Sequence, residues 1–230
     1  MEVTIGGRDY ALSETLHSDE LAPIFADAWT ASRVWNASQF LSEQLVTFAT
    51  QAVDQEPSEC SHHAFDVTNG SSVIELGSGC GLAGLVAAAL GGDVVLTDQR
   101  EALELLARNA KQNMRTDDEA RRVTVVEYQW GTLPSTARLP RTVFDYILVS
   151  DCINPIYGVE SWRNLARSID MLSDDRTITY LAHEARGDDE AMDDFQAFSA
   201  DFLSCERIAH QPDKRLSLFK IRRRTTETVA

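Results

Sequence analysis

In the central part of this chain, short apolar runs typical of strands alternate with segments whose apolar residues have helical spacing. Five short runs have the length and the content of buried strands; they are residues 73–76, 93–97, 123–128, 143–150 and 177–183. Three neighbouring segments repeat apolar residues at helical spacing; they are residues 82–90, 100–114 and 157–173. This alternation predicts parallel strands that are joined by helices.

The C-terminal part departs from this alternation. We expect a helix at 192–203, followed by strands at 205–210 and 216–222 that are joined by a turn around Pro212 and Asp213. Two strands without a helix between them predict an antiparallel hairpin. The whole pattern therefore predicts an α/β fold, a Rossmann-like, doubly wound sheet of seven strands with an antiparallel C-terminal hairpin.

The segment before the first buried strand gives weaker signals. Residues 3–12 predict a β-hairpin that turns at Gly6 and Gly7, and a helix is expected after Trp35. Polar composition predicts loops at 51–69 and 115–122. We divide the chain into an N-terminal extension, one domain and a tail, which are residues 1–28, 29–222 and 223–230.

Composition and charge narrow the class of protein. The 230 residues are 43% hydrophobic and carry a formal net charge of −15. Such a surface disfavours nucleic acid and anionic membranes as partners and suits a basic protein. Four scattered cysteines and five histidines lack the spacing of metal ligands. We therefore expect no metal site, reduced thiols, a cytoplasmic and also nuclear location, and a monomer, although the sequence leaves the oligomeric state open.

The first buried strand ends in a turn with alternating glycines, Gly77, Gly79 and Gly81. Glycine lets a backbone turn sharply and approach a ligand closely, and the start of the following helix offers N–H groups to an anionic or polar ligand. The spacing from Gly79 to Gly84 also matches the dinucleotide-binding pattern, but there the first glycine directly follows the strand. A glycine-rich turn without a ligand is the third interpretation.

Polar and aromatic residues follow the other strands, where doubly wound sheets bind their ligands. Asp98 offers two acceptor oxygens to the hydroxyls of a ribose, or else caps the next helix. Trp130 can cover an adenine ring, or else pack in the core. For Trp35, the residue type alone favours a place in the hydrophobic core. Ser150 and Asp151 stand at the end of the fourth strand.

Five motifs in this order resemble methyltransferase family 16, the seven-β-strand protein methyltransferases. They are VWNAS at 34–38, VIELGSGCGLAGL at 73–85, VLTDQ at 95–99, QWG at 129–131 and SDCI at 150–153. The resemblance covers residues 29–222 and implies S-adenosylmethionine (SAM) as methyl donor and S-adenosylhomocysteine as product. The cofactor-binding residues that it implies are Trp35, Glu75, Gly77, Ser78, Gly79, Asp98, Gln99, Trp130 and Ser150.

The family's acceptor motif, an acidic residue followed three positions later by an aromatic one, falls on Asp151 and Asn154. Asn154 departs from the pattern, because an aromatic ring there would flank the target amine. Tyr157 is the candidate replacement, so the expected catalytic residues are Asp151, Asn154 and Tyr157. The segment 154–157 also resembles the Asn-Pro-Pro-Tyr motif of methyltransferases that act on amide or base nitrogens.

The resemblance implies a SAM-dependent N-methyltransferase that acts on a protein, above all on a lysine side chain. Members of the family modify chaperones, an AAA ATPase and translation elongation factors, so we expect a partner of these kinds or another basic protein. Two alternatives stay open. One is an amide or small-molecule N-methyltransferase, and the other is a SAM-binding interaction protein without catalysis.

Overall fold

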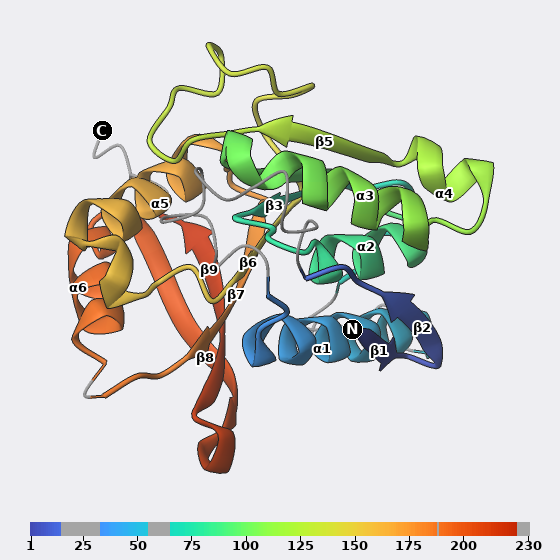
Figure 1. The fold of residues 1–230 in the computed structure, drawn as a ribbon. Coiled ribbons are helices and arrows are strands. Elements are labelled where there is room, and N and C mark those ends of the chain that lie inside the picture. Colours follow the sequence, from blue (N-terminus) through green and yellow to red (C-terminus); the bar gives the residue numbers. More distant parts are fainter. Residues whose placement is uncertain (15–32, 55–64, 188, 225–230) are drawn as a thin grey trace.

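The computed structural model describes residues 1–14, 33–54, 65–187 and 189–224, and a single large sheet organises them (Figure 1). Its strands are β3 (Ser72–Leu76), β4 (Asp93–Asp98), β5 (Val123–Glu127), β6 (Tyr146–Ser150), β7 (Ile178–Glu184), β8 (Leu203–Gln211) and β9 (Leu216–Arg223). They lie in the order β5-β4-β3-β6-β7-β9-β8. The first five are parallel, and β9 runs antiparallel to both neighbours. The predicted seven-stranded doubly wound sheet with its C-terminal hairpin is confirmed.

Helices cover both faces of this sheet (Figure 1). The longer ones are α1 (Asn36–Asp54), α2 (Leu82–Ala89), α3 (Leu103–Asn113), α5 (Val159–Met171) and α6 (Glu190–Ser199). Helices α1, α2 and α3 pack with one set of buried residues, and α5 and α6 pack with the other. Successive residues of a strand point to opposite faces, and accordingly Val73 joins the first cluster whereas Ile74 joins the second.

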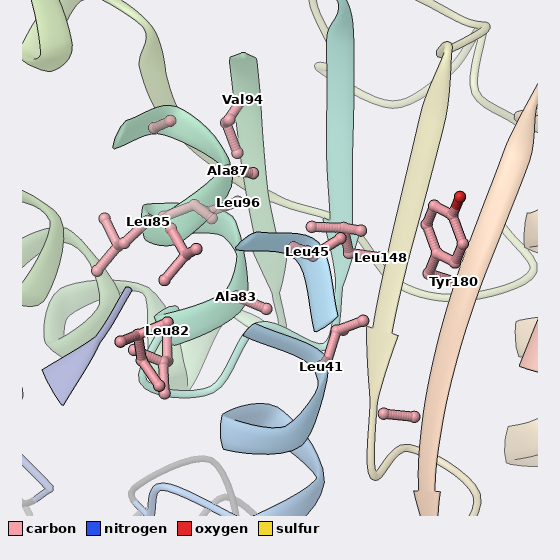
Figure 2. Packing of buried hydrophobic residues seen from close by; sticks show 14 of the residues in the cluster. Leu41, Leu45, Leu82, Ala83, Leu85, Ala87, Val94, Leu96, Leu148 and Tyr180 are labelled. Carbon is pink, nitrogen blue, oxygen red and sulfur yellow. The ribbon is translucent and has the colours of Figure 1, made fainter. Parts of the chain in front are cut away.

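The first cluster lies between α1, α2 and the sheet (Figure 2). Leu41 and Leu45 of α1 and Leu85 of α2 are fully buried with Leu148 of β6 and Tyr180 of β7. Because β3, β4 and β6 are covered on both faces, their sequences are nearly continuous apolar runs instead of alternating ones. This packing fixes the carboxyl ends of β3, β4 and β6 relative to one another.

The predicted N-terminal hairpin is also present, as β1 (Glu2–Ile5) and β2 (Arg8–Ala11). The Asn113 side-chain amide both donates to the carbonyl of Ala11 and accepts from its N–H, each at 2.8 Å. Asn109 makes the corresponding pair with Ser13. These amides tie the hairpin and the residues after it to α3.

Some predicted boundaries are wrong. Residues 115–122 contain a short helix, α4 (Asp117–Arg121), because Thr116 caps it and its acidic first turn suits a helix N-terminus. Strand β6 begins at Tyr146 and not at 143, since Asp145 turns its carboxylate to Ser72. Helix α6 ends at Ser199 because the pairing of β8 with β9 already starts at Leu203.

All three of the proposed divisions include residues that the structure does not describe, which in the domain at 29–222 are 29–32, 55–64 and 188. Residues 15–28 of the extension and 225–230 of the tail lie outside the described residues, as do 55–64 of the predicted loop at 51–69. The part of that loop before residue 55 belongs to α1. Among the described helices, none has both the length and the apolar content of a membrane span.

Candidate active site

A cavity of about 280 Å³ opens beyond the carboxyl ends of β3, β4 and β6. Its walls come from the segment before α1, the glycine turn, the ends of β4 and β6, the loop after β5, and the start of α5. Ten of the twelve predicted site residues line it: Trp35, Gly77, Ser78, Gly79, Asp98, Gln99, Trp130, Ser150, Asp151 and Tyr157. The other two, Glu75 and Asn154, lie outside this set.

Gly77 opens the floor of the cavity. Its φ of 66° lies in the left-handed region, where a side chain is strained. A Cβ there would stand 2.8 Å from the Sγ of Cys152 and 2.8 Å from the ring of Trp130. Glycine therefore lets Cys152 and Trp130 pack closely against this turn, and it lets the backbone itself form the wall of the cavity.

Ser78 and Thr97 fasten the same turn to β4. The Ser78 N–H donates to the Thr97 carbonyl at 2.8 Å, and the Thr97 N–H donates to the Ser78 hydroxyl at 3.0 Å. The Thr97 hydroxyl in turn donates to the Glu75 carbonyl at 2.6 Å. The turn is therefore held in place before any ligand arrives.

Glu75 lies beneath the turn and is fully buried. Its Oε2 accepts from the Gly84 N–H at 3.1 Å, so the side chain joins β3 to the first turn of α2. Oε1 has no hydrogen-bond partner among the described residues. Burial raises the pKa of Glu75 to about 8, although the bond from Gly84 acts in the opposite direction. Glu75 thus supports the turn from below.

Asp98 presents its carboxylate to the cavity at the end of β4. Its Oδ2 accepts from the Gly79 N–H and its Oδ1 from the Gln99 N–H, both at 2.7 Å. Each oxygen keeps acceptor capacity, which is what a pair of vicinal hydroxyls requires. Burial raises the pKa of Asp98, and the two backbone donors oppose that shift. Asp98 does not cap the short helix that follows, whose cap position is Gln99.

Trp130 lies between the core and the cavity. Its ring packs partly against the second core cluster and also lines the cavity. The loop is held because the Gly131 N–H donates to the Ser168 hydroxyl of α5 at 2.8 Å. Gly131 has a φ of 87°, and a Cβ there would meet Asn164 at 2.9 Å. A flat apolar ring is thereby fixed at the edge of the cavity.

The end of β6 forms the opposite side of the cavity. Asp151 is buried and has a φ of 57°, which is uncommon for a residue with a side chain. Arg186, which follows β7, donates to both of its carboxylate oxygens, at 2.9 Å and 2.5 Å. The Arg186 guanidinium also lies 5.5 Å from the centre of the Trp35 ring, and that of Arg33 lies 5.2 Å from it. Trp35 is therefore a cavity residue and not a core anchor.

The segment after Asp151 places the two remaining catalytic candidates, Asn154 and Tyr157, differently. The Asn154 side chain accepts from the Ile156 N–H at 3.1 Å and so caps a short 3₁₀ helix, η3 (Pro155–Tyr157). This helix carries Tyr157 to the cavity wall. The structure thus brings an aromatic ring to the cavity from a position three residues further along than the family motif places one.

Arg186 is one of the residues that we missed in the sequence, and the cavity-lining residues Arg33 and Asn164 are others. The rule that ligand sites follow the carboxyl ends of strands was applied to four strands of the sheet and not to β7. Applied there, it selects residues 184–186. Its effect on Asp151 could not be read from spacing, because the two residues are 35 positions apart.

These residues fit S-adenosylmethionine. Asp98 has acceptors for the ribose hydroxyls, the turn at Gly77 leaves backbone exposed to the amino-acid part, and Trp130 supplies a face for adenine. The groups His, Cys, Asp and Glu form no metal-binding cluster among the described residues.

Comparison with known proteins points to lysine methyltransferases. The family model described as lysine methyltransferase matches residues 26–199. EEF1A lysine methyltransferase 3 of Xenopus tropicalis is 25% identical over 198 residues, which cover 86% of this chain and 77% of the relative. Protein N-lysine methyltransferase METTL21A of Mus musculus is 26% identical over 208 residues, which cover 90% of this chain and 84% of the relative.

Solved structures share the fold at low sequence identity. The glycopeptide N-methyltransferase MtfA in complex with sinefungin has a TM-score of 0.54 and 12% identity, over 78% of this chain and 85% of that one. A TehB-like SAM-dependent methyltransferase from Corynebacterium glutamicum has a TM-score of 0.52 and 13% identity, over 67% of this chain and 81% of that one.

Proposed function

The chain belongs to the lysine methyltransferase family and is a SAM-dependent protein lysine methyltransferase, and we propose that the cavity at the ends of β3, β4 and β6 is its active site. The observation that supports this most is the arrangement of Asp98 and Asp151 on two walls of one cavity. One carboxylate suits the ribose of the cofactor, and the other marks the side from which an acceptor nitrogen arrives.

We assign the cofactor contacts as follows. Asp98 and Gln99 hold the ribose, the turn from Gly77 to Gly79 holds the amino-acid part, and Trp130 covers the adenine. Trp35 and Ser150 complete the wall toward Asp151. The bound cofactor supplies an electrophilic methyl group on a sulfonium sulfur.

The reaction is an in-line displacement at that methyl group. The nitrogen lone pair of the acceptor forms the new N–C bond while the C–S bond breaks, and the electron pair stays on sulfur. A lysine acceptor must first lose a proton to solvent, because an ammonium has no lone pair. Asp151 and Tyr157 orient the acceptor, and much of the rate comes from holding both reactants together.

The geometry favours lysine over an amide acceptor. Amide recognition would need Asn154 to face the cavity, but its side-chain oxygen is used to cap η3. Tyr157 instead brings an aromatic ring to the wall, as suits an aliphatic amine. The amide alternative therefore loses the residue on which it depended.

We infer that the protein substrate is basic. The chain carries a net charge of −15, which attracts a positively charged surface and repels phosphate. One relative is named as a methyltransferase of EEF1A, and we propose a translation elongation factor of that kind, with chaperones and ATPases as the next classes to examine. We further propose that the protein acts as a monomer in the cytoplasm and nucleus.

Radiolabelled SAM and a cell extract test the function. We expect the wild-type protein to label a protein band, and Asp151→Ala to lose this labelling while its affinity for SAM stays within about threefold. Asp201→Ala, which removes an exposed carboxylate in a turn, is the matched control and should label as the wild type does.

Three other results would reject the function or its parts. Label that enters only small molecules would support the small-molecule alternative. SAM binding without any transfer would indicate an interaction protein. Full labelling by Asp151→Ala would remove Asp151 from the acceptor side.

A further inference from the structure

We propose that Arg186 is a positioning residue that keeps the Asp151 carboxylate occupied, so that the acceptor side of the cavity receives an uncharged nitrogen and excludes an ammonium. This inference rests on the proposed function, because it takes Asp151 as the acceptor side. No family motif quoted above contains Arg186.

The ion pair uses both partners fully. Arg186 Nη1 and Nη2 each donate to a different oxygen of Asp151, at 2.9 Å and 2.5 Å, which is the bidentate geometry of strong charge-assisted pairs. The Asp151 side chain is only 3% exposed and that of Arg186 is 30% exposed. A cation that arrives from the cavity therefore meets a carboxylate whose charge is already matched.

The segment that carries Arg186 is tied at several points. Arg186 Nη1 also donates to the Glu184 carbonyl at 3.2 Å, and the Ala185 N–H donates to the Arg215 carbonyl at 2.9 Å. On the two sides of Arg186, the side chains of His183 and Asp189 are hydrogen-bonded to each other at 2.7 Å. Arg186 is consequently held against Asp151 by its own segment as well as by charge, and substrate binding does not have to displace it.

Of the described charges near Arg186, the Arg33 guanidinium adds to its positive charge and the Glu184 carboxylate opposes it. Arg33 lies over the ring of Trp35, as Arg186 does. Two further ionisable groups among the described residues interact electrostatically with Arg186, the Glu184 carboxyl and the Tyr157 hydroxyl. Glu184 partly offsets the cations but is turned toward Asn36, whose amide donates to it at 3.2 Å.

The consequence concerns the protonation state of the acceptor. An unpaired carboxylate within a few ångströms stabilises an ammonium and raises its pKa, whereas a neighbouring cation lowers it. Methyl transfer needs the nitrogen lone pair, so an unpaired Asp151 would hold lysine in its unreactive form. Paired with Arg186, Asp151 can still accept a hydrogen bond from a neutral amine, because each oxygen has a second lone pair.

Binding of n-butylammonium to the S-adenosylhomocysteine complex tests this without turnover. The probe mimics a lysine side chain and is charged at about pH 7. Ligand-observed NMR should show that Arg186→Gln binds the probe about tenfold more tightly than the wild type, as expected for one added unpaired carboxylate. Arg186→Lys keeps the cation but not the bidentate geometry, so its affinity for the probe should lie nearer to that of the wild type than to that of Arg186→Gln. Asp151→Asn with Arg186→Gln should lose the gain.

Activity gives a second readout. In the labelling assay, Arg186→Gln should move the alkaline rise of the rate to higher pH by about one unit or more, whereas Arg186→Lys should not. A merely structural residue would lower the rate equally at all pH values. The probe experiment does not depend on an identified substrate, so failure of labelling would affect the proposed function and leave the probe result standing.

Certain results would overturn the inference. Equal binding of n-butylammonium by wild type and Arg186→Gln would do so, and so would a gain that survives the loss of the Asp151 charge. If Arg186→Gln does not fold, the test uses the wild type and follows the Arg186 Nε–H resonance during titration with the charged probe at about pH 7. Saturable binding that shifts this resonance contradicts the proposal. An unchanged resonance at saturating probe supports it.

Discussion

Glu75 shows how a single buried carboxyl can set the pH range of a fold. It is fully buried, one of its oxygens lacks a partner among the described residues, and burial raises its pKa to about 8. The folded state therefore holds a proton that the unfolded state releases near its ordinary pKa of about 4.3. Stability is unaffected below that value, falls as pH rises through the interval, and is lowest above about 8.

We expect Glu75→Gln to remove this dependence. The variant keeps an oxygen for the Gly84 N–H but carries no charge, so its free energy of unfolding should exceed that of the wild type by a few kcal/mol at about pH 9. The two proteins should converge near pH 4 to 5. Urea unfolding measures the difference, and Glu127→Gln, an exposed position on β5, should match the wild type at both pH values.

Gly77 illustrates a second effect at the residue scale, that of space. Gly77→Ala should weaken SAM binding at least about tenfold, because its Cβ would crowd Cys152 and Trp130, and should cost about 1–3 kcal/mol of stability. Gly7→Ala is the matched control. It has a similar φ of 77°, but a Cβ there would meet no described atom within 4 Å.

Calorimetric titration separates crowding from strain in this pair. We expect Gly7→Ala to lose some stability and to keep its SAM affinity. Equal SAM affinity in Gly77→Ala and the wild type would show that the space above Gly77 is not part of the cofactor site.

At the scale of elements, the N-terminal hairpin depends on α3. Asn113 makes two hydrogen bonds to Ala11 and Asn109 makes two to Ser13, all between buried or partly buried groups. Apolar residues of the hairpin, among them Tyr10 and Leu12, belong to the first core cluster. The hairpin is thus part of the packed body, although its own sheet has only two strands.

Asn113→Ala should leave the Ala11 N–H and C=O without partners. We expect a loss of about 2–3 kcal/mol in stability and faster hydrogen exchange at Ala11. Gln112→Ala changes an exposed neighbour on the same helix and should alter neither quantity. Unchanged exchange at Ala11 in Asn113→Ala would mean that the apolar contacts alone hold the hairpin.

The helices and strands that apolar periodicity predicted are those that pack in the hydrophobic core. The strands β3, β4 and β6 could be found because burial on both faces forces apolar residues into one run. Helix α4 was missed because its five residues include no buried one and so show no apolar period. The spacing of Thr116 and Glu119 was the signal that could have shown it.

The candidate site follows the same division. Residues that stand directly after a strand, such as Asp98 and Asp151, were predictable from the sheet rule. The position of Tyr157 in the cavity wall and the capping role of Asn154 both depend on the hydrogen bond from the Ile156 N–H to the Asn154 side chain. Composition does not reveal this bond. The pairing of Arg186 with Asp151 depended on the approach of two loops, which only the packed sheet determines.

The whole molecule carries a field that no single residue supplies. A net charge of −15 over 230 residues gives a negative surface potential, which speeds the approach of a basic partner and is screened by salt. The cofactor contacts that we propose lie within the cavity, over distances shorter than the Debye length, so salt should screen them less. The two steps of recognition, docking of a protein and binding of SAM, should therefore differ in their response to ionic strength.

We expect kcat/KM for the labelled protein to fall at least about tenfold when salt is raised from about 0.05 M to about 0.5 M, because the Debye length shrinks from above 10 Å to below 8 Å. The affinity for SAM, measured by calorimetry at the same salt concentrations, should change by less than about threefold, since its contacts lie within the cavity. Sucrose at matched viscosity controls for slower diffusion. A kcat/KM that does not respond to salt would contradict a basic substrate surface, and an equal loss in SAM affinity would assign the effect to the cofactor site.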